Sequence, residues 1–249
     1  MTNTRATLTS TAILDAAEQL FARHGHDKTS MRQITTTAGV NLAAVHYHFG
    51  SKEQLIQAVF KRRLAILNQE RLQILDALEA QAAGQPLKPS QVVEAFFSPL
   101  VRHAYCEDQS CRPFTPLIEH SRFDQDGFIG ALFTEEHSGV VIRFRKAFQE
   151  ALPNVPLEEI LWRFNFMLGA TSYAIMGMDA LRTAVGLAPQ AESKRATVDE
   201  VLQRLLSFLL GGLRAPLPGQ PAPPPDSDTP KKSYTTAPPA SQPDTESIL

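Results

Sequence analysis

Residues 29–53 read TSMRQITTTAGVNLAAVHYHFGSKE, and this stretch decides the fold of the amino-terminal part of the chain. A capping box that starts at Ser30 predicts one short helix, and Gly39 stands where that helix would end in a left-handed turn. Asn41 is then placed to cap a second short helix. Two short helices joined by a tight glycine turn are typical of a helix-turn-helix, which we therefore expect at residues 30–49.

The second of these helices is suited to lie in the major groove of DNA. It begins with compact residues that let its backbone approach base edges, and Ala43 or Ala44 can touch a thymine methyl group. Val45 is expected to face inward and to hold the helix against Ile34 and Leu20. Side chains expected to contact bases or phosphates are Thr29, Ser30, Arg32, Asn41, Leu42, Ala43, Ala44, His46, Tyr47, His48 and Lys52.

The charge of the chain is unevenly distributed. The 249 residues carry a net charge of -2, but residues 1–63 hold eight Lys and Arg against four Asp and Glu. That segment therefore carries +4 and the remainder -6. A basic segment on an acidic body indicates that one part of the chain meets a polyanion. The alternative for residues 29–53 is a plain helical hairpin in a core, which would seldom place two histidines, a tyrosine and a lysine so close together.

At these residues the chain resembles the DNA-binding domain of the TetR family of bacterial transcriptional regulators. The resemblance implies a homodimer that binds a pseudo-palindromic operator in double-stranded DNA and leaves it when a small ligand enters the carboxy-terminal domain. Three positions differ from the residues common in the family: Thr35, Leu42 and His46. These differences affect which operator sequence is bound and leave the expected fold unchanged. The matching segments are ILDAAEQLF at 13–21, Gly25, TSMRQI at 29–34, AGV at 38–40, YHF at 47–49 and SKEQL at 51–55.

The remainder of the folded chain is also expected to be helical, so the predicted fold class is all-α. Apolar residues recur at helical spacing, strand-like alternation is absent, and further helices are expected at residues 126–152, 157–187 and 197–213. We divide the chain into a helix-turn-helix domain at 7–67, a ligand-binding and dimerisation domain at 68–214 and a proline-rich, disordered tail at 215–249.

The second domain has a weaker similarity to the fatty-acid-responsive repressors of the same family. It is carried by NLAAV at 41–45, LWRFNFMLGA at 161–170 and GMDALR at 177–182. The resemblance implies an apolar effector, such as a long-chain fatty acid or its acyl thioester. Most apolar residues of this domain must form a core, but part of the set is expected to line a tunnel for the effector. The expected ligand-binding residues are Phe96, Phe97, Leu100, Leu117, Arg122, Phe128, Leu132, Arg163, Phe166, Met167 and Tyr173.

Two helices of this domain are candidates for the dimer interface. Small residues at 169–174 and Gly177 permit close helix contact, and they pair with an apolar face made by Val198, Leu202, Leu205, Leu206 and Leu209. The alternative is that these residues pack within one subunit.

Several other classes of protein and site are disfavoured. Apolar runs fall short of the roughly 18 residues that span a bilayer, and residues 1–9 lack a signal-peptide core, so a cytoplasmic protein is expected. Cys106 and Cys111 make no disulfide framework. His46 and His48 point apart on a helix, and His103 with the cysteines lacks a fourth zinc ligand. No metal or cofactor is therefore expected.

Signatures of catalysis are missing from the sequence. There is no phosphate-cradling glycine loop, no nucleophile elbow and no zinc-protease motif, and the acidic stretch at residues 122–133 lacks the end positions of a calcium loop. The chain is therefore not expected to be an enzyme, although one acting on acyl thioesters stays open. A second alternative is an all-helical lipid carrier whose amino-terminal hairpin is merely structural.

Overall fold

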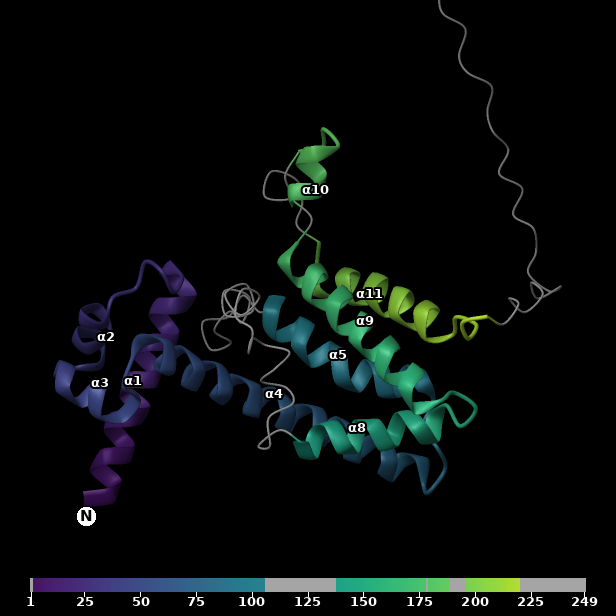
Figure 1. Cartoon of the computed structure of the whole chain (residues 1–249), viewed down its shortest axis with the longest axis horizontal. Helices are drawn as coiled ribbons and strands as arrows, with labels where there is room; N and C mark the ends of the chain where they lie inside the picture. The colour runs from purple at the N-terminus through teal and green to yellow at the C-terminus, as the bar shows by residue number, and fades with distance from the viewer. Residues whose placement is uncertain (1, 106–137, 178, 189–195, 220–249) are drawn as a thin grey trace, which may run out of the picture. The chain divides into compact units, whose positions relative to one another are not determined.

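The computed structural model describes residues 2–105, 138–177, 179–188 and 196–219, and this part of the chain is built from helices without strands (Figure 1). The all-α prediction is confirmed. The chain divides into two units, Met1–Ala215 and Pro216–Leu249, and all helices named below belong to the first. They are α1 (Thr2–His24), α2 (Met31–Ala38), α3 (Leu42–Phe49), α4 (Lys52–Ala82), α5 (Pro89–Tyr105), α8 (Ser138–Ala151), α9 (Leu157–Met176), α10 (Asp179–Ala184) and α11 (Val198–Leu213).

The short helices α2 and α3 begin and end through local hydrogen bonds. The Ser30 hydroxyl accepts from the Gln33 backbone N–H, and the Asn41 side chain accepts from that of Ala44. Between them Gly39 adopts φ 67°, where a side chain would be strained, and its N–H donates to carbonyls of the last turn of α2. At the start of α4, Ser51 makes a second capping box with Gln54. The predicted helix-turn-helix is present.

Helix α4 joins this motif to the rest of the first unit. It has 31 residues, which corresponds to about 46 Å at 1.5 Å per residue. Its first turns contact α1 and α3, and it also packs against α5 and α8. Leu55, Val59 and Leu64 are fully buried, as is Leu75 towards the other end. A single helix therefore contributes side chains to the core beneath the helix-turn-helix and to the core of the second domain.

Helix α5 lies at the centre of the second domain. It contacts α4, α8, α9 and α11, and the residues from 95 to 101 are all buried. Phe96 makes edge-to-face contacts with Phe97, Phe144 and Phe164, with ring centroids 4.8–5.0 Å apart. Such aromatic pairs add specific geometry to the apolar burial. This aromatic cluster forms the middle of the core.

The predicted long helices are confirmed in part. Helix α11 begins as expected, with a capping box between Thr197 and Glu200. The continuous helix expected at residues 157–187 is wrong, because α9 ends at Gly177 with φ 84° and α10 begins at Asp179. Of the helix expected at 126–152, residues 126–137 lie outside the described part. Within the described ranges, no helix is long and apolar enough to span a membrane.

Candidate DNA-binding interface

Helix α3 packs against its neighbours through one face and exposes the other face to solvent. Val45 is fully buried, and α3 packs on α1, α2 and α4 in a core that also buries Ile34. The inward position predicted for Val45 is confirmed. On the outer face the side chain of Leu42 is 43% exposed and that of Tyr47 83% exposed, and Ala43 and His46 are exposed as well. A short helix that is fixed by one buried face and exposed along the other has the arrangement of a helix that can enter a groove.

His46 is oriented by the turn that follows α3. Its Nδ1 lies 2.7 Å from the carbonyl oxygen of Gly50, and since a carbonyl can only accept, Nδ1 must carry the proton. In the neutral ring Nε2 is then an acceptor, which suits the amino group of adenine or cytosine in the major groove. Gly50 itself has φ 72°, a conformation that favours glycine.

Three predicted contact residues have roles within the fold. Thr29 is only 1% exposed, and its hydroxyl donates to the carbonyl oxygens of Gly25 and Leu20 at 2.8 and 3.3 Å. A DNA contact by the Thr29 side chain is therefore not supported. Ser30 and Asn41 remain exposed, but their side-chain oxygens cap α2 and α3. Their caps set the positions of both helices.

The cationic side chains flank α3 on neighbouring elements. Arg32 is exposed in the first turn of α2, and Lys52 is half-buried in the first turn of α4. His48 is half-buried and lies edge-on to Tyr47, with ring centroids 5.1 Å apart. Beside Lys52, the pKa of Glu53 is lowered by the backbone N–H and the Ser51 hydroxyl, which donate to its carboxylate. The start of α4 therefore already holds one negative charge at neutral pH.

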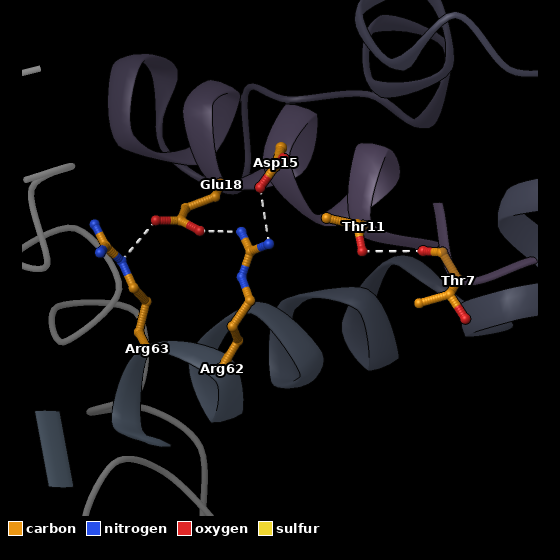
Figure 2. A network of polar contacts seen from close by, with 6 residues as sticks. All are labelled: Thr7, Thr11, Asp15, Glu18, Arg62 and Arg63. Atoms are coloured by element: carbon orange, nitrogen blue, oxygen red, sulfur yellow. Dashed lines mark hydrogen bonds and ion pairs between the residues drawn. The ribbon is translucent and has the colours of Figure 1, made fainter. Parts of the chain in front are cut away.

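An ion-pair network joins α1 to α4 (Figure 2). Glu18, on α1, is 5% exposed and pairs with the guanidinium groups of both Arg62 and Arg63, the latter through Nε at 2.6 Å. Arg62 also donates to Asp15 at 2.8 Å. Figure 2 shows the carboxylate of Glu18 between the two arginines. Because α1 supports α2 and α3, this network ties the helix-turn-helix to the long helix.

Two family models match the chain around this geometry. The model described as bacterial regulatory proteins, tetR family, covers residues 13–59, and that of the tetracyclin repressor-like C-terminal domain covers residues 94–212. The chain belongs to the tetR family. Departures at Thr35, Leu42 and His46 leave the family's helix-turn-helix intact in this tetR-family protein.

Named relatives agree with this membership. The transcriptional regulator BetI of Agrobacterium fabrum is 33% identical over 86 residues, which are 34% of this chain and 40% of BetI. A transcriptional repressor of Mycobacterium tuberculosis is 50% identical over 48 residues, 19% of this chain and 26% of that protein. The chain thus matches less than half the length of these relatives. They are named as regulators, in agreement with the prediction that the chain is not an enzyme.

Among solved structures, the fatty acid degradation regulator FadR from Bacillus halodurans has a similar fold. Its TM-score is 0.53 at 13% identity, over 83% of this chain and 96% of FadR. At this identity the likeness concerns the fold.

Apart from Arg163, the residues predicted to bind an effector in the tetR-type second domain fall into three groups. Phe96, Phe97, Leu100 and Met167 are buried in the core described above. Phe166 and Tyr173 are 65% and 64% exposed, and their contact with an effector stays a prediction. Leu117, Arg122, Phe128 and Leu132 lie outside the described residues, as do Cys106 and Cys111.

Arg163 is engaged in holding two helices together. It is 7% exposed, its Nε donates to Glu159 at 2.7 Å, and its Nη1 donates to the carbonyl oxygen of Leu213 at 2.5 Å. Leu213 is the last residue of α11, where unpaired carbonyls favour a cation. Arg163 therefore caps α11 from α9, and the prediction that it positions an effector's polar head is not supported.

The helices predicted to form a dimer interface have both buried and exposed apolar residues. Leu202, Leu205 and Leu209 are buried within the subunit, so for these the alternative of packing within one chain is correct. Exposed aromatic residues on the same two helices are Trp162, Phe166, Tyr173 and Phe208, from 54% to 70% exposed. We call these four the α9–α11 apolar face. In Figure 1 α9 and α11 run side by side.

One polar residue of the second domain was missed from the sequence. Arg71 is fully buried on α4. The available signal was its spacing, since it falls in register with the apolar residues Leu64, Leu67, Leu75 and Leu78 of the same helix. No group of three or more metal-ligating side chains occurs in the ranges that the structure describes.

Proposed function

We propose that this chain is a DNA-binding transcriptional regulator, and in the first place a repressor, that binds operator DNA with α3 in the major groove. The observation that carries the proposal is the outer face of α3, where Leu42, His46 and Tyr47 are exposed while Val45 anchors the helix. Arg32 in the first turn of α2 and Lys52 in the first turn of α4 would supply positive charge to phosphates. Such a regulator would act in the cytoplasm, where its operator lies.

A homodimer is part of the proposal. Two recognition helices read successive major grooves on one side of DNA when they lie about 34 Å apart, or a multiple of that distance. The α9–α11 apolar face supplies a surface for the second subunit, since four large apolar side chains on neighbouring helices are seldom left in water. The operator is then a pseudo-palindrome.

Release from DNA would follow binding of a small apolar effector in the second domain, with a long-chain fatty acid or its acyl thioester as the first candidates. A ligand that prefers one of two dimer states by about 5.5 kcal/mol carries the population from nearly all bound to nearly all released. Burial of an acyl chain supplies energy of this order, at about 0.8 kcal/mol per methylene. Helix α4 supports this coupling because it packs in both cores.

The proposal is tested by footprinting on the DNA that flanks the gene, at near-physiological salt, with and without a long-chain acyl thioester. We expect a protected inverted repeat that disappears when the acyl compound is added. Protection that persists would retain the regulator and reject the acyl thioester as its effector. Diffuse protection that vanishes with moderate salt would contradict specific DNA binding and favour a lipid carrier.

A further inference from the structure

Among the described residues, Arg71 is a fully buried arginine whose hydrogen bonds are incomplete. Its Nε donates to the carbonyl oxygen of Phe96 at 2.8 Å, and its Nη1 donates to Oδ1 of Asn68 at 2.9 Å. The guanidinium carbon lies 3.8 Å from the centre of the Phe96 ring. Nη2 is buried and has no hydrogen-bond partner in the described structure. One face of the guanidinium is therefore stacked, and one of its corners is left without an acceptor.

The charge of Arg71 is compensated only in part by its surroundings. Desolvation lowers its pKa to about 9 against a smaller opposing effect of the Glu70 carboxylate, so Arg71 still carries a proton at neutral pH. Its two hydrogen-bond acceptors are neutral amide oxygens. The nearest acidic residue in the sequence, Glu70, places its carboxylate 2.7 Å from Nε2 of His103 instead. A buried cation with neutral partners is unfavourable unless something else supplies the negative charge.

Other arginines of the same unit have guanidinium groups that are paired with carboxylates. Each of four arginines forms an ion pair with a carboxylate, which lies on another helix for Arg62, Arg63 and Arg143 and one turn earlier on the same helix for Arg163. All four are at least slightly exposed. Arg71 combines complete burial with no carboxylate partner among the described residues, which sets it apart from this group.

The acceptor on α5 lies next to a position where the helix lacks a hydrogen bond. Pro99 lies inside α5 and has no N–H for the carbonyl oxygen of Ala95, four residues before it. The carbonyl oxygen of Phe96, the next residue, accepts from Nε of Arg71 on α4. Around it, the rings of Phe97, Phe144 and Phe164 form apolar walls. A cation at the edge of an aromatic core matches a ligand with an acidic head and an apolar body.

We propose that Arg71 is the anchor for the carboxylate of an apolar monocarboxylic effector, which pairs with Nη2 and extends among the phenylalanines of α5, α8 and α9. The inference rests on the proposed function and narrows it to a free acid. A thioester or alcohol offers a neutral oxygen, which does not compensate the buried charge. Because Arg71 is enclosed, the acid must displace core contacts between α4 and α5, and it thereby acts on the helix that carries Arg62 and Arg63.

The test compares sodium decanoate with decan-1-ol, both below their aggregation limits, binding to the full chain in the absence of DNA. Calorimetry or quenching of Trp162 fluorescence reports the affinities. We expect decanoate to bind at least tenfold more tightly, since a hydrogen bond to a charged group is worth more than a neutral one. Equal affinities would overturn the proposal on the unaltered chain, without any variant.

Substitutions then assign the difference to one side chain. Arg71→Gln should bring the affinity for decanoate down to that for decan-1-ol and leave the alcohol unchanged, whereas Arg71→Lys should retain part of the preference. The matched control is Arg143→Gln, which removes a partly exposed, carboxylate-paired arginine from α8. A preference that survives in a folded Arg71→Gln chain would refute the assignment.

The outcomes separate this inference from the proposed function. If neither decanoate nor decan-1-ol binds, the Arg71 anchor is refuted, while the footprint of the inverted repeat still decides whether the chain is a regulator. If decanoate binds through Arg71 but no inverted repeat is protected, the anchor stands and the regulator is rejected.

Discussion

Replacement of Glu18 by Gln tests the junction between the helix-turn-helix and α4. The change keeps the shape of the side chain and removes the negative charge that Arg62 and Arg63 share. Glu18 and Arg63 have side chains that are only 6% and 10% exposed. After the substitution, Arg63 is a nearly buried cation that has lost its ion pair with Glu18.

The size of the effect follows from these exposures. Removal of one partner from a buried ion pair costs about 3–5 kcal/mol. Arg62 keeps Asp15 at 2.8 Å and is 25% exposed, so its charge is still partly compensated. We therefore expect the lower end of the range, a loss of about 3 kcal/mol in the free energy of unfolding. The loss should also appear as faster hydrogen exchange in the second half of α1.

Urea denaturation followed by circular dichroism measures the change, at one protein concentration because a dimer's stability depends on it. Asp15→Asn is the matched control, since Asp15 pairs with Arg62 in the same network but is 50% exposed. The control should cost less than about 1 kcal/mol. A loss below about 1 kcal/mol for Glu18→Gln, or equal losses for both variants, would refute the reasoning that burial makes this network strong.

Three further predictions concern a DNA phosphate contact, the cap of α3 and the dimer. Lys52→Ala should weaken binding to all DNA sequences and lower the slope of log affinity against log salt by about one, as a fluorescence anisotropy titration would show; an unchanged slope would exclude a phosphate contact. Asn41→Ala should lower stability by about 1 kcal/mol through loss of the α3 cap, whereas Asn41→Ser should keep it; equal melting of both variants would contradict the capping role. Phe166→Arg on the α9–α11 apolar face should yield folded monomers by light scattering, while Ile142→Arg on α8, also exposed, should leave the dimer unchanged; dimeric Phe166→Arg would place the interface elsewhere.

The helix-turn-helix was predictable because its signals are local. Each short helix is begun by a side chain that bonds within three residues of itself, as at Ser30, Asn41 and Ser51. The turn between the helices requires the positive φ of Gly39. Val45 was identified from its spacing alone. These features depend only on residues close together in the sequence, so the family's motif can be identified without the structure.

The assignments that failed depend on contacts between distant segments. Thr29 is polar and lies beside the motif, but its burial against Leu20 and Gly25 is set by how α1 and α2 meet. Leu205 lies on an apolar stripe that suits an interface or a core equally well, and only the packing of α11 on α5 and α9 decides. The contacts of two arginines also could not be predicted from neighbouring residues. Arg163 donates to Leu213, which is 50 residues away, and Arg71 donates to Phe96, which is 25 residues away.

The length of α4 has a mechanical consequence. For a rod of about 46 Å, a tilt of about 5° around one end moves the other end by about 4 Å. In a two-fold dimer both rods tilt, so the spacing of two α3 helices changes by up to about 8 Å against the 34 Å of one DNA turn. A rearrangement among the phenylalanines of the second domain, too small to disturb the fold, is thereby magnified into a mismatch with the double helix.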